Sequence, residues 1–192
     1  MRLKTRIITS LVALLVCLAG LGGFSLLRLS SGHQVTEKIT SDWLPGVVAA
    51  ANISGAGKDM RLGILGLLGA QSTEEAQGMD QGIQKSRAAI EQSIAAYEAM
   101  IVNEEERALH NERARNWKTY EEYAMRTRAL ALKGEREGAM AAAAAARAPY
   151  NAFDASNAKL MAFNIEGAKK ATAASRDAYQ ASLWVILGGL LF

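Results

Sequence analysis

The chain has 192 residues, of which 50% are hydrophobic, 21% charged and only 6% aromatic, and its formal net charge is +3. Three of its 22 basic residues, Arg2, Lys4 and Arg6, form the N-terminal tip, and the 19 that remain equal the 19 Asp and Glu in number. The basic balance therefore comes from the tip, and nothing else in the composition indicates a nucleic-acid partner. The one cysteine, Cys17, excludes an intramolecular disulfide, so a hydrophobic core has to hold any folded domain.

An uncharged run at residues 7–27 follows the basic tip directly. Crossing the hydrocarbon layer takes about 20 apolar residues, whereas the apolar part of a cleaved signal peptide has about 7–15. The sequence therefore predicts a transmembrane helix at residues 7–28, with cleavage after Ala19 as the alternative. By the positive-inside rule the tip, residues 1–6, lies in the cytoplasm and the chain after the span is exported.

The exported segment, residues 29–181, is predicted to be helical nearly throughout. Its only prolines are Pro45 and Pro149, and it is rich in Ala, Glu, Lys, Arg and Gln. Apolar residues recur three and four positions apart, which is the period of a helix that buries one face. Breaks near residues 69–73, 103–104 and 133–135 divide the segment into four helices joined by short turns, which favours an all-α, antiparallel, up-down four-helix bundle. The expected helices span residues 29–70, 74–102, 104–132 and 135–180.

A second apolar run occupies residues 181–192. It is shorter than a complete crossing, so residues 182–192 are predicted to be the start of a second transmembrane helix. Trp184 lies where an aromatic side chain would meet the outer headgroup layer. The alternative is a C-terminal helix packed on a soluble core, although residues 183–192 offer no polar face. The expected bundle thus stands on the membrane, with its first and last helices continuous with the spans.

Several short motifs, taken in order, resemble a known family. Asp42-Trp43-Leu44-Pro45 stands early in the first helix, Arg61 lies two-thirds of the way up it, and residues 130–139 have an apolar helix end followed by Gly, an acid and Ala. With the basic tip and the first span, the whole chain resembles the N-terminal part of a bacterial methyl-accepting chemotaxis receptor with a four-helix-bundle sensor.

The resemblance implies a homodimeric sensor in the bacterial inner membrane, with the bundle in the periplasm. Such a sensor binds a small molecule near the tip of the bundle and signals through the second span. The signal reaches a cytoplasmic domain with a HAMP linker and a kinase-controlling coiled coil, which would follow this chain. Membrane lipid, a second copy and cytoplasmic signalling proteins are the expected partners, besides the ligand.

The candidate ligand site is placed by its depth in the bundle. Arg61 lies about 11 residues before the first tip, or roughly 16 Å down a helix, and comparable depths on the third and fourth helices carry two more arginines and two tyrosines. Arginine binds carboxylates bidentately, so the layer suits an anion with two or three carboxylates. The alternative interpretation is a set of solvated arginines and core tyrosines. The predicted ligand-binding residues are Arg61, Arg126, Arg147, Tyr123 and Tyr150.

The resemblance also bears on the ligand, because Arg61 matches the ligand-binding arginine of the family. Aspartate-sensing members carry further arginines five and nine residues later, where this chain has Gly66 and Ala70. Malate, succinate or citrate is therefore the preferred class of ligand, and amino acids are the alternative.

Gly63, Gly66 and Gly69 suggest close approach to a partner helix at the dimer interface, or else a loosened helix end.

No catalytic or cofactor-binding pattern is recognisable. His33 and His110 lack the further donors that a metal site needs, and Glu104, Glu105 and Glu106 suit the positive end of a helix. No Ser or Cys has a base beside it, so the segment is not expected to be an enzyme or to hold a cofactor or metal. The alternatives to a chemoreceptor are the sensor of a transmembrane histidine kinase or nucleotide cyclase, and a membrane-tethered structural protein without a ligand.

Overall fold

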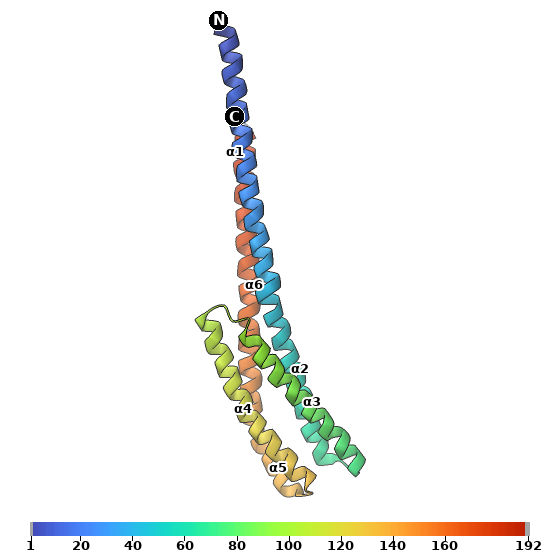
Figure 1. Cartoon of the computed structure of the whole chain (residues 1–192). Helices are drawn as coiled ribbons and strands as arrows, with labels where there is room; N and C mark the ends of the chain where they lie inside the picture. Colours follow the sequence, from blue (N-terminus) through green and yellow to red (C-terminus); the bar gives the residue numbers. More distant parts are fainter. Residues whose placement is uncertain (1, 191–192) are drawn as a thin grey trace. The chain divides into compact units, whose positions relative to one another are not determined.

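The computed structural model describes residues 2–190, and every regular element in this range is helical (Figure 1). The all-α expectation is therefore confirmed. The chain divides into two compact units, one made of Met1–Ser41 with Gly167–Phe192 and the other of Asp42–Glu166. Met1, with which the predicted tip begins, and residues 191–192, with which the second predicted span ends, lie outside the described residues.

The first unit contains α1 (Arg2–Lys38) and the C-terminal part of α6 (Arg147–Leu190). Large apolar side chains are exposed on both helices, including Leu11 and Val16 on α1 and Trp184 on α6. Among the described residues, no helix is found to be both long and apolar enough for a membrane crossing. The spans predicted at residues 7–28 and 182–192 are thus not supported by the structure and stay a prediction.

The second unit holds four helical rods, as the sequence predicts. They are α2 (Leu44–Gly69), α3 (Thr73–Glu98), α4 (Glu104–Leu132), and a fourth rod in which α5 (Arg136–Ala145) is followed by the first part of α6. The bounds of α4 agree with the predicted third helix, whereas α3 ends at Glu98 instead of residue 102. The reason is a longer turn, in which the Met100 N–H donates to the Tyr97 carbonyl over 2.9 Å.

Two helices of the bundle begin with the same reciprocal cap. Ser72 accepts a hydrogen bond from the Glu75 N–H, and the Glu75 carboxylate accepts one from the Gln71 N–H over 2.9 Å. At the start of α4, Asn103 accepts from the Glu106 N–H, and the Glu106 carboxylate accepts from the N–H of residue 102 over 3.1 Å. Each cap satisfies donors that a helix start would otherwise leave without partners. The turns are therefore specified by local chemistry.

Prolines explain the two interruptions of the long helices. Pro45 has no N–H to donate to residue 41, and a short π-helix, η1 (Ile39–Trp43), stands just before it. Pro149 likewise cannot donate to Ala145, and the fourth rod is interrupted at Ala146, between α5 and α6. The predicted first and fourth helices, at residues 29–70 and 135–180, are therefore each divided in two.

The core of the bundle lies among all four rods and is built from apolar side chains that recur at helical spacing. The close approach of α2 depends on glycine: a Cβ on Gly63 would lie 2.8 Å from Ile83 of α3, and one on Gly66 would lie 3.0 Å from the Met79 sulfur. These two glycines thus serve the packing of α2 on α3 within the bundle, so the expectation that they meet a partner at the dimer interface is corrected. Gly69 has open space around it.

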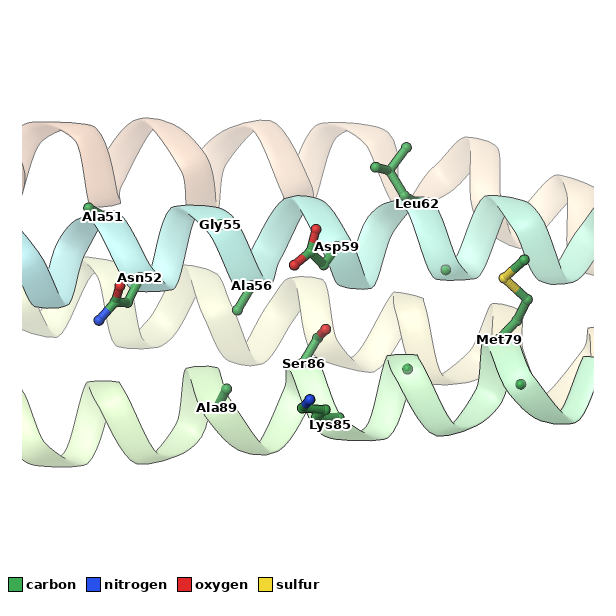
Figure 2. A pocket seen from close by; sticks show the side chains of 13 residues that line it. Ala51, Asn52, Gly55, Ala56, Asp59, Leu62, Met79, Lys85, Ser86 and Ala89 are labelled. Carbon is green, nitrogen blue, oxygen red and sulfur yellow. The ribbon is translucent and has the colours of Figure 1, made fainter.

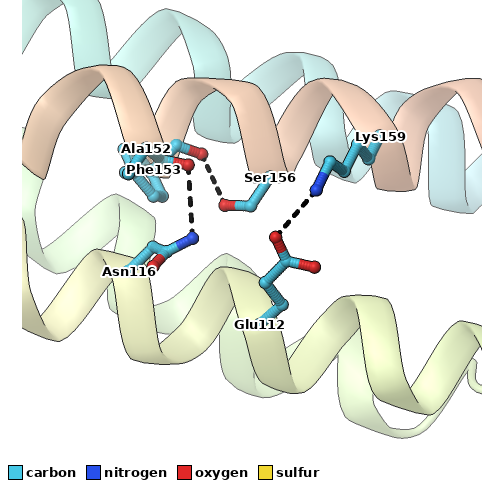
Figure 3. Close-up of polar contacts among 6 residues, drawn as sticks. All are labelled: Glu112, Asn116, Ala152, Phe153, Ser156 and Lys159. Atoms are coloured by element: carbon cyan, nitrogen blue, oxygen red, sulfur yellow. Dashed lines mark hydrogen bonds and ion pairs between the residues drawn. The ribbon is translucent and has the colours of Figure 1, made fainter.

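Polar contacts join α4 to α6 along the outside of this core (Figure 3). Lys159 forms an ion pair with Glu112 at 2.9 Å, and the Asn116 amide donates to the Ala152 carbonyl over 3.3 Å. Exposed pairs of this kind contribute little free energy of unfolding, about 0–1 kcal/mol. They join α4 to α6 at the surface of the bundle and add little to its stability.

Candidate functional site

The candidate site is built around Arg61, which lies in the C-terminal half of α2. Its guanidinium carbon stands 4.2 Å from the centroid of the Tyr150 ring on α6, within the range of a cation–π contact. Arg61 and Tyr150 are both half-buried. The contact therefore joins the second and the last helix of the chain at a position that small solutes can reach.

Aromatic rings form the floor beneath this contact. The Tyr120 ring of α4 packs edge-on against Tyr150, with centroids 5.2 Å apart, and it stacks on Phe153 of α6 at 6.1 Å. Trp117 of α4 lies 5.2 Å from Phe153. Burial raises the pKa of both Tyr120 and Tyr150, and the nearby Arg61 opposes the rise. Both phenols are therefore neutral at physiological pH and act as hydrogen-bonding groups.

The geometry leaves Arg61 able to bind an anion. A guanidinium that lies over a ring uses its face for that contact, while its N–H groups point outward in its own plane. Among the hydrogen bonds and ion pairs of the described residues, none involves the Arg61 side chain. The planar guanidinium can donate two parallel hydrogen bonds to one carboxylate. The site is therefore suited to a ligand that carries a carboxylate.

The helix interruption at Ala146 lies next to the candidate site and affects how Tyr150 is held. Tyr150 comes one turn after Ala146, where the fourth rod changes from α5 to α6, and directly after Pro149. Its N–H still donates to the Ala146 carbonyl over 3.0 Å, so the ring is held at the start of the regular part of α6. A ligand that moved Tyr150 would therefore act on the first turn of a 44-residue helix.

A comparison with protein families decides what kind of module this is. Residues 1–179 match the family described as a four-helix-bundle sensory module for signal transduction. The chain belongs to this family. The resemblance to the N-terminal sensor of a methyl-accepting chemotaxis receptor is thereby confirmed. A comparison with curated proteins gives no match.

Within the sensory module, the predicted site residues have different surroundings. Arg61 and Tyr150 are in contact, and Tyr123 of α4 is half-buried against the core. Arg126 and Arg147 are exposed, and no contact joins them to Arg61 or Tyr150 among the interactions of the described residues. Whether these five residues bind a ligand stays a prediction, in which Arg61 and Tyr150 have the most direct geometric support.

One residue of the site is absent from the predicted set. Tyr120 lies between the Tyr150 ring and the core, with only 2% of its surface exposed. The burial of Tyr120 could have been predicted from the helical period of α4. Buried residues recur there at spacings of three and four, namely Trp117, Tyr120, Ala124 and Thr127. Extending the helical period along the predicted third helix would have found it.

A second cluster of polar residues is buried elsewhere in the sensory module. The Tyr97 hydroxyl donates to the Glu106 carboxylate over 2.6 Å and accepts a hydrogen bond from the Asn164 amide. Arg113 lies over the Tyr97 ring, with its guanidinium carbon 4.6 Å from the centroid, and it contacts His110. In the described part of the chain, no group of three or more His, Cys, Asp or Glu side chains is arranged to hold a metal ion.

The cluster gives Glu106 a larger role than the sequence suggested. The three glutamates of residues 104–106 were expected only to complement the positive end of a helix. Glu106 is instead 2% exposed and accepts hydrogen bonds from both Tyr97 and the backbone before α4. Burial, followed by the hydrogen bond to Glu106, raises the pKa of Tyr97, so its phenol keeps its proton and remains a donor.

Proposed function

We propose that this sensory module is the periplasmic sensor of a chemoreceptor in the bacterial inner membrane and binds a small carboxylate at Arg61. The observation that carries the proposal is the Arg61 guanidinium held over the Tyr150 ring, with none of the hydrogen bonds or ion pairs of the described residues using its N–H groups. A di- or tricarboxylate such as malate, succinate or citrate is the proposed ligand class. The module itself would carry out no catalysis.

The distribution of charge around the site favours a ligand that carries more than one carboxylate. Arg61 offers one fork, and Tyr120 and Tyr150 offer neutral phenols beside it. Arg126 on α4 and Arg147 at the start of α6 are exposed, and a ligand with a second carboxylate could recruit either one. An amino acid is the alternative ligand, and its ammonium group would need an acceptor such as Asp154, which is half-buried one turn after Tyr150.

The proposed signal runs along α6. Ligand bound to Arg61 on α2 and to Tyr150 on α6 would favour one packing of these helices over another, and only by its difference in affinity for the two packings. Helix displacements of about 1–2 Å are common in receptor transitions. Because α6 continues to Leu190, such a displacement would be carried towards the cytoplasmic kinase-controlling domain.

Membrane attachment of the module rests on the sequence and on exposed apolar surface. On α1, large apolar side chains that are more than half exposed occur at consecutive positions and at helical spacing. An apolar surface of this extent in water is uncommon and marks contact with lipid or with another protein. The side chains concerned are Ile7, Ile8, Leu11, Val12, Leu15, Val16 and Leu18.

The ligand proposal is tested by calorimetric titration of the whole chain in mild detergent with malate, succinate, citrate and amino acids. We expect micromolar binding of a di- or tricarboxylate, and we expect Arg61→Ala to weaken it at least tenfold, because a charge-assisted hydrogen bond is worth about 1.5–3 kcal/mol. Arg115→Ala is the matched control, since Arg115 is exposed on α4, and it should bind as the unchanged chain does. Equal affinity in the Arg61→Ala variant would contradict the proposed site.

The proposed homodimer has a candidate surface on the outer side of α2. Exposed apolar side chains follow this helix at Leu44, Val48, Leu62 and Leu65. Beside them is a groove of about 770 Å³ between α2 and α3 (Figure 2), with Asp59 on one side and Lys85 on the other. The small residues along the groove would let a second helix approach closely, and a pair of opposite charges suits a two-fold interface. They are Ala51, Gly55, Ala56, Gly78, Gly82 and Ala89.

We expect a cysteine in this surface to cross-link two copies of the chain. Val48→Cys, in a chain whose single cysteine is replaced by Cys17→Ser, should give a covalent dimer on oxidation in native membranes, detected on a non-reducing gel. Lys118→Cys is the control, because Lys118 is exposed and lies on α4 instead of α2. Cross-linking at residue 118 but not at residue 48 would assign the interface to another face.

A further inference from the structure

His110 is a buried histidine that the proposed ligand site does not use. It lies on α4 with 5% of its surface exposed, and its ring stacks on Tyr97 of α3 with centroids 5.6 Å apart. Its Nδ1 atom is 2.9 Å from the NH2 nitrogen of Arg113, one turn later on α4. The imidazole is therefore enclosed between an aromatic ring and a buried guanidinium.

The identity of these two groups fixes the protonation state of His110. Arginine has five N–H donors and no acceptor, so the contact is a hydrogen bond only if Nδ1 is the acceptor. His110 must then be neutral, with its proton on Nε2. Adding a proton to Nδ1 would remove the acceptor and place two cations within hydrogen-bonding distance of each other, away from water.

The other ionisable groups around His110 do little to stabilise a positive charge on its ring. On α3 the ionisable neighbours of His110 are Tyr97 and Glu98, and on α4 they are Glu106, Arg107 and Arg113. Glu106 already accepts from Tyr97 and from the backbone. The parts of α6 and α2 that face the cluster are neutral, namely Asn157, Asn164 and the Ala50 carbonyl. Burial and then the Arg113 charge lower the pKa of His110 below its ordinary value of 6.5.

Arg113 links the histidine to the helix that would carry the signal. Its guanidinium is completely buried, and burial lowers its pKa to about 10, so it remains charged at physiological pH. One nitrogen donates to Asn157 of α6 over 3.5 Å, and the Asn157 amide donates to the Ala50 carbonyl of α2 over 2.8 Å. The Arg113 Nε atom has no partner among the described residues, so the guanidinium is held by few contacts.

We propose that the sensory module also responds to proton concentration, with His110 taking up the proton and Arg113 being displaced by it. Displacement of Arg113 removes the hydrogen bond that orients the Asn157 amide oxygen, and so weakens the hold on the side chain whose N–H ties α6 to the Ala50 carbonyl of α2. This response uses residues outside the proposed carboxylate site and does not depend on that site. A fall in pH outside the cytoplasm would then loosen α6 without any organic ligand.

The sign of the response follows from the two protonation states. Because the pKa of His110 is lower in the folded chain than in the unfolded chain, the unfolded chain binds more protons below pH 6.5. The stabilising contribution is therefore complete above about pH 6.5 and is lost as the pH falls through the lowered pKa. Each unit of difference between the two pKa values corresponds to about a tenfold change in the opening equilibrium.

The experiment is hydrogen exchange on the whole chain in detergent, measured by mass spectrometry between pH 7.5 and 5.0 and corrected for intrinsic exchange rates. We expect protection of residues 153–164 to fall by up to about tenfold for each unit by which the pKa of His110 is lowered. His110→Gln, which is neutral throughout, should show no such fall. His33→Gln, which removes the other histidine, should behave like the unchanged chain.

A second measurement keeps the test decisive if His110→Gln does not fold. Titration of the His33→Gln chain with labelled histidine, followed by NMR, reports the pKa of His110 alone. A value well below 6.5, together with the loss of protection, is the expected result. A value of 6.5 or above, or a loss of protection that persists in His110→Gln, would overturn the proposal.

Discussion

Replacing Phe153 by alanine is expected to lower the free energy of unfolding by about 3–5 kcal/mol, the range found for buried aromatic side chains. Phe153 is 1% exposed and lies where three rods meet. Its ring contacts Trp117 at 5.2 Å and Tyr120 at 6.1 Å between centroids. Its edge would lie 3.0 Å from a Cβ on Gly57 of α2, so α2 has no side chain at this position to fill the space that the ring would leave.

The measurement is unfolding of the whole chain in urea, followed by circular dichroism and by tryptophan fluorescence. Met140→Ala is the control, because Met140 is exposed on α5 and its loss should change the free energy of unfolding by no more than about 0.5 kcal/mol. The loss of Phe153 should also disturb Tyr120, which stacks on it and forms the floor of the candidate ligand site. A cost below 1 kcal/mol for Phe153→Ala would show that this ring does not hold the rods together.

The parts of the fold that depend on local chemistry were predictable from the sequence. The bounds of α4 agree with the predicted third helix because Asn103 and Glu106 form a recognisable cap and Gly134, with φ of +77°, makes the turn after it. The interruptions at η1 and at Ala146 were missed although both prolines were noted. A proline shows that one hydrogen bond is absent, but it does not show whether a long helix absorbs the defect or divides.

Glycine spacing illustrates what a single sequence leaves open. Gly63 and Gly66 require close approach of another group, and this requirement could be read from the sequence. The group proved to be Ile83 and Met79 of the same bundle instead of a second copy. A periodic set of small residues therefore locates a contact along a helix, whereas the identity of the partner depends on how the helices are arranged around the core.

The candidate site was predicted by depth in the bundle, which explains why only some of its residues lie together in the structure. Counting residues from the tip placed Arg61 near Tyr150, and the two are in contact. Depth does not specify a face, and successive residues of a helix differ by about 100° in direction. Arg126 precedes the buried Thr127 by one residue and is exposed, so it shares the layer without facing the core.

The buried polar cluster was missed because His110 was considered only as a metal ligand and Glu106 only as a complement to the positive end of a helix. The helical period places both in the core: Glu106, His110 and Arg113 precede Trp117 at spacings of four, three and four residues, on one face of α4. Asn157 and Asn164 flank the buried Leu160 on α6 in the same manner. A polar residue at a core position of the period is expected to have a buried partner, and following the period along both helices would have assembled the cluster.

Replacing Glu106 by alanine is expected to lower the free energy of unfolding by about 2–4 kcal/mol. It leaves two hydrogen-bond donors without their acceptor, one buried and one half-buried, and the buried one alone costs about 1–3 kcal/mol. One donor is the Tyr97 hydroxyl at 2.6 Å, and the other is the N–H of residue 102 at 3.1 Å. The Tyr97 hydroxyl also accepts a hydrogen bond from Asn164 of α6. If Tyr97 moves when Glu106 is removed, the hydrogen bonds that link α3, α4 and α6 are lost. The effect should appear in urea unfolding of the whole chain.

Glu106→Gln separates the hydrogen bonds of this residue from its charge. The glutamine keeps an oxygen that can accept from Tyr97 and removes the negative charge, which lies in the same cluster as the Arg113 guanidinium. If the hydrogen bonds dominate, Glu106→Gln should cost clearly less than Glu106→Ala. If the two variants cost the same, the charge of Glu106 is what stabilises the buried Arg113, and the position of the guanidinium depends on it as much as on His110. A cost below about 0.5 kcal/mol for both would contradict the view that this cluster joins the rods.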